Sequence, residues 1–237
     1  MKRYLSVFEM ITRSSIYKVL MILVGMVTVE AVCFYLSMIN PSGLNIEEYI
    51  DQSQYSLIFK LAYVLVTIVI VLPGMNLGTV QSYTLQRLRI KENRIFWIQA
   101  LYNVFAYVLL WGTQLMMLLG SAWIYQNNLP EGAVWTTQTL FLAFHRNEFM
   151  HTILPIEDVP GWWMIALAGI TLALATAGFT RLQRKRKFGF ELLILVAATL
   201  IYFPRQLGYD IAFMVLIYTF IYVVMGFRAI SENLGGD

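Results

Sequence analysis

The chain alternates between long apolar runs and short polar segments, a pattern typical of a helical membrane protein. An α-helix rises about 1.5 Å per residue, so a run of about 20 apolar residues crosses the ~30 Å hydrocarbon core of a bilayer. The apolar runs predict an all-α, polytopic membrane protein with six transmembrane helices. The spans are predicted at residues 16–39, 56–80, 95–126, 161–180, 188–203 and 210–227.

The N-terminal segment, residues 1–15, also has a helical pattern. Its apolar residues recur at helical spacing among basic ones, which predicts an amphipathic helix lying on the inner surface of the membrane. A frayed basic tail is the alternative interpretation. The apolar positions are Tyr4, Leu5, Phe8 and Ile11.

The longest segment between spans, residues 127–160, contains an apolar stretch from Ala133 to Phe144. These 12 residues would reach only about 18 Å as a helix, which is short of the bilayer core. We therefore expect an interfacial or re-entrant helix within an outer loop, and a single transmembrane domain over residues 1–237.

Composition supports a membrane protein and excludes several other classes. Hydrophobic residues make up 59% of the 237 and charged residues only 13%, whereas about a quarter of an ordinary soluble domain is charged. Such a chain has too little polar surface for a soluble globule, and it is neither disordered nor a nucleic-acid-binding domain. The single cysteine, Cys33, excludes an internal disulfide.

The distribution of charge predicts the orientation of the spans. Of the 17 Lys and Arg residues, 14 fall in or just after residues 1–15, in residues 81–94, in residues 181–187 and in the C-terminal tail. Because cytoplasmic loops carry the excess of basic residues, these segments and both termini are predicted to lie inside. A full crossing by residues 133–144 would cancel this bias. We expect a multi-pass protein of the cell membrane, and the lack of an N-x-S/T acceptor favours the bacterial cytoplasmic membrane.

The chain lacks the motifs of the common enzyme classes. It contains no G-x-x-x-x-G-K-[ST], no H-E-x-x-H and no G-x-S-x-G, and its two histidines lie together in the outer loop. The predicted spans hold few ionisable side chains, so they offer little for acid–base or nucleophilic chemistry. We expect neither an enzyme nor a metal site nor a cofactor held by this chain.

The polar segment 81–94 has a short helical edge with basic flanks. Leu85 and Leu88 are three residues apart, so one helical turn presents both. Such a helix suits docking into a groove on a soluble partner, although the charges could also serve only to anchor the topology. The basic residues around the edge are Arg87, Arg89, Lys91 and Arg94.

The run SYTLQRLRIKENRIFWIQALYNVFAYVLLW (82–111) resembles the segment after the second span of ABC-2 type transporter permeases. In that family the basic helix after span 2 is a coupling helix that contacts the ATPase. The predicted six spans, the amphipathic N-terminal helix and the lack of an ATPase domain are also similar. One difference is that the long outer insert here lies between spans 3 and 4, whereas the family often has a re-entrant element between spans 5 and 6.

The resemblance implies a permease subunit that forms part of a translocation pathway for export. It implies a separate, dimeric ABC ATPase that carries ATP and Mg, and a second permease, identical or related, that completes the pathway. The coupling residues would be Leu85, Arg87, Leu88, Arg89, Lys91 and Arg94. The alternative is an accessory or sensor subunit of a membrane complex, with no pathway of its own.

Glu30 is the main ionisable residue predicted at depth in the membrane. It lies about 14 residues into the first span, where a carboxylate costs several kcal/mol unless it is protonated, paired or wetted. It is therefore a candidate for the translocation path. The alternative is a neutral, hydrogen-bonded glutamate between helices, or one near enough to the surface to reach water.

The outer loop carries a group of polar residues that could form a lid over an outer opening. A structural cap, tied by Arg146 to a nearby acid, is equally consistent. A metal site is disfavoured, because histidines six residues apart do not share one face of a helix. The lid candidates are His145, Arg146, Glu148 and His151.

Two further features concern lipids and packing. The basic run at 181–187 lies beside the predicted inner leaflet, so attraction to anionic lipids accounts for it, with ATPase contact as an additional interpretation. Small residues repeat every four positions in span 4 and predict close helix packing. The basic residues are Arg181, Arg184, Lys185, Arg186 and Lys187, and the small ones are Gly169, Ala173 and Ala177.

Overall fold

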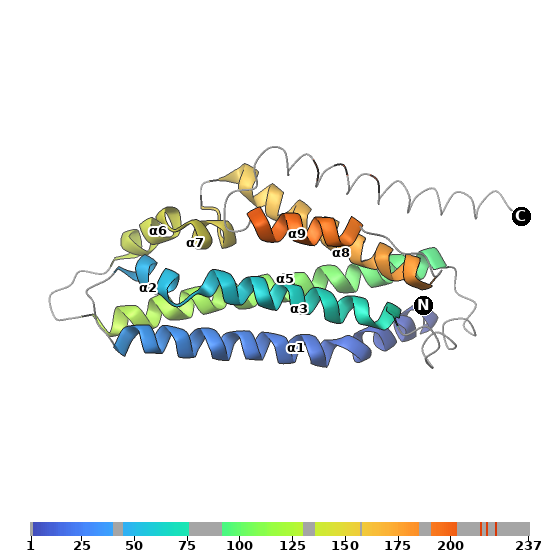
Figure 1. Ribbon diagram of the computed structural model, residues 1–237, viewed down its shortest axis with the longest axis horizontal. Helices are drawn as coiled ribbons and strands as arrows, with labels where there is room; N and C mark the ends of the chain where they lie inside the picture. Colours follow the sequence, from blue (N-terminus) through green and yellow to red (C-terminus); the bar gives the residue numbers. More distant parts are fainter. Residues whose placement is uncertain are drawn as a thin grey trace, which may run out of the picture.

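The computed structural model describes residues 2–39, 45–75, 92–129, 136–156, 158–184 and 191–202, together with three single positions, Met214, Ile217 and Ile221. Every regular element in these ranges is an α-helix (Figure 1). The helices are α1 (Lys2–Ile39), α2 (Ile46–Gln52), α3 (Tyr55–Met75), α5 (Glu92–Asn127), α6 (Thr137–Arg146), α7 (Glu148–Ile153), α8 (Val159–Arg184) and α9 (Glu191–Tyr202).

Four of these helices are long and apolar enough to cross a membrane. They agree in position with the first four predicted spans, so the all-α prediction is confirmed and the helices are compatible with a multi-pass membrane protein. Helix α9 falls within the fifth predicted span, but its 12 residues rise only about 18 Å. The sixth span, residues 210–227, lies outside the described residues except for the three single positions. The candidate spans are Ser15–Ile39, Tyr55–Leu72, Arg94–Asn127 and Val159–Gln183.

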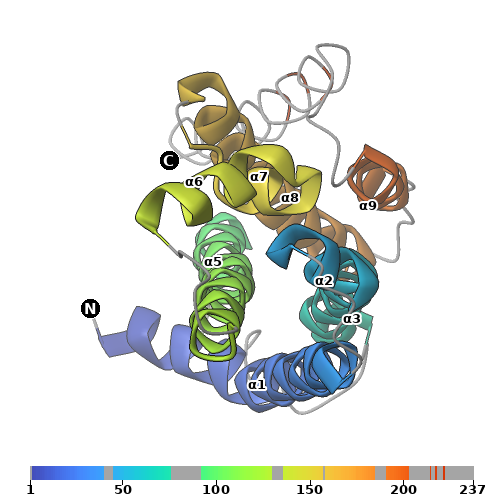
Figure 2. The same ribbon diagram turned by 90° about the vertical axis from the view of Figure 1, so that its left-hand side faces the viewer.

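The N-terminal segment is helical, as predicted, but it is not a separate element. Helix α1 runs without a break from the predicted surface helix into the first span. In Figure 2 its first turns extend to the side of the rest of the helix, towards the N label. The ring of Phe8 packs edge-on against Tyr102 of α5, with 6.4 Å between ring centroids. The alternative of a frayed basic tail does not agree with the structure, in which the segment is helical from Lys2 onwards.

The four long helices form one bundle. Helix α1 packs against α3 and α5, and α8 packs against the same two helices from the opposite side (Figure 2). Helix α9 lies outside this bundle, against α8. The inner faces are apolar and continuous, so burial of these faces holds the helices together.

The short helices α2, α6 and α7 gather at one end of the bundle, where α1 ends and α3 begins (Figure 1). We call these three helices the cap, and this end of the bundle the capped end. The apolar stretch predicted as an interfacial or re-entrant helix overlaps α6, and a second short helix, α7, follows it within the loop. The interfacial or re-entrant placement stays a prediction. Neither α6 nor α7 meets the length needed for a candidate span.

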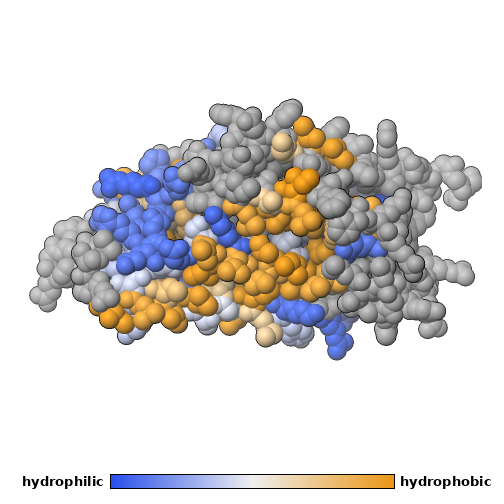
Figure 3. Space-filling view, viewed as in Figure 1, coloured by the Kyte–Doolittle hydropathy of each residue, from blue (hydrophilic) through white to orange (hydrophobic). Residues whose placement is uncertain are grey.

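The outer faces of the long helices expose large apolar side chains, as a lipid-facing surface requires. In Figure 3 apolar residues cover the middle of the visible face, with polar residues towards the capped end. Soluble monomers rarely expose contiguous apolar patches larger than a few hundred Å². Examples on three different helices are Met21 (75% exposed), Leu61 (55%) and Met116 (77%).

The small-residue stripe of α8 lies in the bundle interior. All ten residues from Thr171 to Thr180 are buried, and Ala173 and Ala177 are both completely inaccessible. Small side chains let α8 approach its neighbouring helices α3, α5 and α9 closely, which accounts for the burial of this whole stretch. The predicted packing role of this stripe therefore agrees with the structure.

Replacing Ala173 with leucine should destabilise the bundle. The added methyl groups have no free space, and overpacking typically costs about 1–3 kcal/mol. Thermal unfolding of the purified protein in detergent would detect the loss as a lower Tm. Ala166→Leu is the matched control, because Ala166 is exposed on the same helix. An equal Tm for the two variants would contradict close packing at Ala173.

Candidate functional site

Glu30 lies on the inward face of α1. It continues a stripe of buried residues at helical spacing, and its own side chain is completely inaccessible. Nine residues separate it from the end of α1 at Ile39, a rise of about 14 Å. This position is deep within a ~30 Å hydrocarbon core. The rest of the stripe is apolar and consists of Val19, Leu23, Met26 and Phe34.

The nearest polar neighbours of Glu30 come from two other helices. Gln114 of α5, also completely buried, lies close enough for its amide to act on the carboxyl, and Tyr55 of α3 is within electrostatic reach. Yet no hydrogen bond of good geometry joins them, because within the described part of the chain both Glu30 oxygens and both polar atoms of the Gln114 amide have no partner. No cation of the described residues acts on Glu30. The bundle interior therefore contains an unpaired carboxyl beside an unpaired amide.

The polar groups around this pair are hydrogen-bonded. The Tyr55 hydroxyl and the Ser121 hydroxyl lie 2.6 Å apart, and Ser121 also donates to the carbonyl of Met117 at 2.9 Å. Further along α5, the Asn103 side-chain nitrogen donates to the Thr176 hydroxyl at 2.8 Å. Glu30 and Gln114 differ from Asn103 in that both polar atoms of each side chain lack a partner among the described residues, whereas Asn103 lacks one only for its side-chain oxygen.

Sequence reasoning identified Glu30 by its charge but missed the neutral polar face of α5. The sequence did contain a signal for this face, because its four polar residues follow one another at spacings of 4, 11 and 7 positions. These spacings are close to whole numbers of helical turns, so the four side chains share one face. All four are buried in the structure. They are Gln99, Asn103, Gln114 and Ser121.

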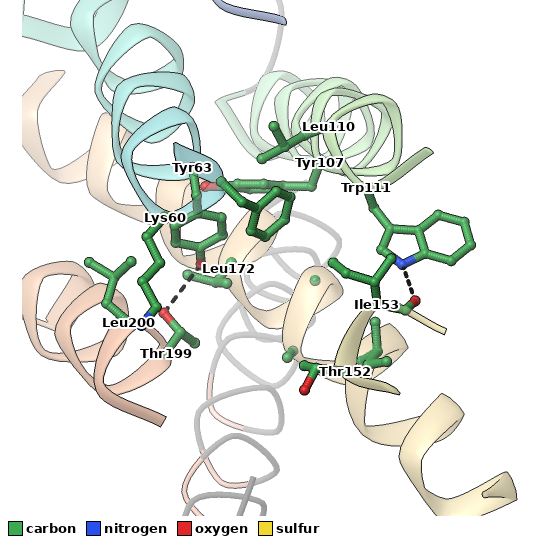
Figure 4. Close-up of a pocket in the computed structure, with 14 residues that line it drawn as sticks. Lys60, Tyr63, Tyr107, Leu110, Trp111, Thr152, Ile153, Leu172, Thr199 and Leu200 are labelled. Carbon is green, nitrogen blue, oxygen red and sulfur yellow. Dashed lines mark hydrogen bonds between the residues drawn. The ribbon is translucent and has the colours of Figure 1, made fainter. Parts of the chain in front are cut away.

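A cavity of about 140 Å³ lies between α3, α5, α7, α8 and α9 (Figure 4). Its wall is largely apolar and aromatic, and Tyr63, Tyr107 and Trp111 contribute the large rings. No sequence pattern pointed to this space, because five segments far apart in the chain enclose it. The cavity and the Glu30 pair are separate features, since neither Glu30 nor Gln114 lines the cavity.

The lid candidates lie in the cap, and two of them meet. The imidazole rings of His145 and His151 are perpendicular with centroids 5.6 Å apart. The expectation that they would not share a face is wrong, because the chain is not one helix there: α6 ends at Arg146 and α7 begins at Glu148. The described residues contain no group of three or more His, Cys, Asp or Glu side chains that could hold a metal.

The other two lid candidates, Arg146 and Glu148, are exposed. Arg146 lies near Glu47 of α2. Partial burial raises the pKa of Glu47, and the positive charge of Arg146 opposes that rise. This arrangement is consistent with a structural cap tied by Arg146 to a nearby acid, while the lid role stays a prediction.

Asn147, which sequence reasoning missed, joins the parts of the cap. Its side-chain nitrogen donates to the Asp51 carboxylate of α2 at 2.9 Å, and its side-chain oxygen accepts from the backbone nitrogen of Met150 at 3.0 Å. The second bond is a helix N-cap on α7. The sequence signal was asparagine followed by Glu148, an acid suited to the first turn of a helix.

Three of the remaining predicted site residues are described, and they lie at the opposite end of the bundle. Arg94 is exposed in the first turns of α5, and Arg181 and Arg184 belong to the last turn of α8. Acidic residues of α2 occupy the capped end, so charge of opposite sign marks the two ends of the described bundle. The other basic and coupling candidates lie outside the described residues. They are Leu85, Arg87, Leu88, Arg89, Lys91, Lys185, Arg186 and Lys187.

Replacing Glu30 and Gln114 together with leucine should stabilise the protein. Apolar side chains of similar size remove four buried polar atoms that have no partner, so we expect a gain of about 1–3 kcal/mol and a higher Tm. Tyr55→Phe, which removes one partner of a 2.6 Å hydrogen bond, should lower Tm instead. A lower Tm for the double variant would mean that the pair has stabilising partners.

Asn147→Ala should loosen the cap. The change removes the N-cap of α7 and the bond to Asp51, each contributing about 1 kcal/mol. Hydrogen exchange followed by mass spectrometry should show faster exchange in α6 and α7, with the long helices unaffected. Asn128→Ala is the control, because Asn128 bonds only within its own helix, to the Ile124 carbonyl. Unchanged exchange in α7 would exclude the linking role.

Comparison with known proteins assigns no family to this chain. No family model, no curated protein and no solved structure matches it. Four helices long enough to cross a membrane, together with an apolar exterior, make it compatible with a multi-pass membrane protein.

Proposed function

We propose that the chain is the membrane-spanning permease subunit of an ABC transporter, coupled to a separate ATPase and working in export. The observation that carries the proposal is the position of the two helix ends that precede and follow the basic segment 81–94 in the chain. Helix α3 ends at Met75 and α5 begins at Glu92, both at the end of the bundle opposite the cap (Figure 1). The basic residues Arg181 and Arg184 of α8 lie at the same end. A soluble partner would therefore dock at this end, which the charge bias assigns to the cytoplasm.

The bundle interior supports a role beyond anchoring. An unpaired carboxyl and amide at Glu30 and Gln114 cost free energy, and intramembrane ionisable groups often mark a transport path. A single bundle of this kind would supply part of a pathway, and a second permease, identical or related, would supply the rest. ATP and Mg would bind to the ATPase subunits and not to this chain.

One observation favours the second candidate, an accessory or sensor subunit. Glu30 and Gln114 are completely inaccessible, so no opening reaches them in this conformation. A closed interior suits a subunit that binds and signals without a pathway of its own. The two candidates differ in whether an ATPase joins the complex directly through residues 81–94.

Extraction of the tagged full-length chain in mild detergent should recover an ATPase with it. Arg87→Glu with Arg89→Glu should weaken that association by about tenfold or more, because two basic contacts become repulsive. Quantitative mass spectrometry of the purified complex measures the recovery. Arg205→Glu, in a connection predicted to lie on the outer side, is the charge-reversal control and should retain the ATPase.

Two outcomes would contradict the proposal. One is a wild-type complex without any ATPase, and the other is full recovery of the ATPase with the doubly reversed chain. Either result would favour the accessory subunit, provided that the variants are inserted and folded to the same level as the wild type.

A further inference from the structure

The size of the cavity limits what it can hold. Its volume is about 140 Å³. An engineered apolar cavity of about 150 Å³ in another protein stays dry and binds benzene. The space between α3, α5, α7, α8 and α9 therefore fits one ring or a few methylene groups of a chain, and not a large polar molecule.

The wall of the cavity favours an apolar occupant. The polar atoms of its aromatic side chains are already hydrogen-bonded within the protein, so they offer little to a polar ligand. The rest of the wall between them is mainly aliphatic or aromatic carbon. The bonds join the Tyr63 hydroxyl to Thr199 (3.3 Å), the Tyr107 hydroxyl to Thr67 (3.0 Å) and the Trp111 ring nitrogen to the Ile153 carbonyl (2.8 Å).

Lys60 is the exception in this wall. It is the one charged residue among those that line the cavity in the described part of the chain, and no Asp or Glu accompanies it there. Its side chain is half-buried on α3 and leans towards Thr199 and Leu200 of α9 (Figure 4). The cavity thus combines apolar space with a single positive charge.

The depth of Lys60 suits a headgroup at the membrane surface. Lys60 follows the start of α3 at Tyr55 by five residues, a rise of roughly 8 Å from the capped end of that helix. A lysine stem can carry its ammonium group from such a depth to the interface. An anionic headgroup there can pair with Lys60 while the apolar part of the same molecule enters the cavity.

We infer that this cavity is a binding site for an anionic amphiphile, with the apolar chain or ring in the space beside Trp111 and the anionic headgroup on Lys60. Apolar burial and charge pairing act together, so the site selects an anionic amphiphile over a neutral one of the same shape. The inference depends on the cavity and on Lys60, and holds whether or not an ATPase binds the chain.

The test uses the full-length protein in nanodiscs of neutral phosphatidylcholine. The probes are a bromine-labelled fatty acid and the bromine-labelled alcohol of the same chain length, at equal mole fractions in the bilayer. Bromine quenches tryptophan fluorescence at short range, and the signal of Trp111 is the difference between the wild type and Trp111→Phe. We expect saturable quenching of Trp111 by the acid, with an affinity about tenfold higher than that of the alcohol.

Two variants separate the contributions of charge and space. Lys60→Met should abolish the preference for the acid, whereas Lys18→Met, which removes a lysine of α1 that does not line the cavity, should retain it. Gly169→Leu should block both probes, because Gly169 lines the cavity and a Cβ added there meets no atom within 4 Å. Gly25→Leu is the control, since its Cβ is equally unobstructed and Gly25 lies outside the cavity.

The source of the amphiphile is distinguished by a third probe, bromine-labelled phosphatidylglycerol built into the nanodisc. Lys60-dependent quenching by this lipid identifies an anionic bilayer lipid as the occupant, and quenching by the fatty acid alone identifies a free, single-chain amphiphile. Both results support the site. Equal quenching by acid and alcohol in the wild type, a preference for the acid that persists in Lys60→Met, or quenching that persists in Gly169→Leu would overturn it.

Discussion

Hydrocarbon offers no hydrogen-bond partners, and the architecture follows from that constraint. Each backbone polar group must be satisfied within its own segment, so the spans are helices. Hydroxyl groups obey the same rule by bonding to the preceding turn. In α8, Thr171 donates to the Leu167 carbonyl at 2.6 Å, and Thr180 donates to the Thr176 carbonyl at 2.8 Å. Polar side chains can therefore line the bundle interior without contact with water.

Glu30 and Gln114 are exceptions to this pattern of internal hydrogen bonding. Their buried polar atoms are unpaired, whereas the nearby Tyr55 and Ser121 hydroxyls are joined at 2.6 Å. Burying these unpaired atoms destabilises the folded state, and the packing of α1, α3 and α5 around the pair must offset that free energy. The pair is for this reason a better candidate for function than Asn103 or Ser121 of α5, which are also buried but are hydrogen-bonded through at least one side-chain atom.

The two ends of the bundle are built differently. The capped end is organised by local helix breaks and by Asn147, which binds α2 and α7 at once. At the opposite end lie basic residues of α5 and α8, the last turn of α3 and the first turn of α5. The cavity with Lys60 is lined in part by α7 of the cap, while the proposed soluble partner would bind at the other end. A ligand and a partner would thus act on opposite ends of the same helices.

The sequence by itself determined the all-α class, the positions of the four long apolar helices and the presence of an ionisable residue, Glu30, within the first of them. Each depends on the length of one apolar run or on one charge within it, which are local properties. Only the tertiary structure decided that Gln114 lies beside Glu30, that His145 meets His151 and that five helices enclose a cavity with one lysine. These depend on helix rotation, on the break at Asn147 and on packing between distant segments, and no local pattern encodes such relations.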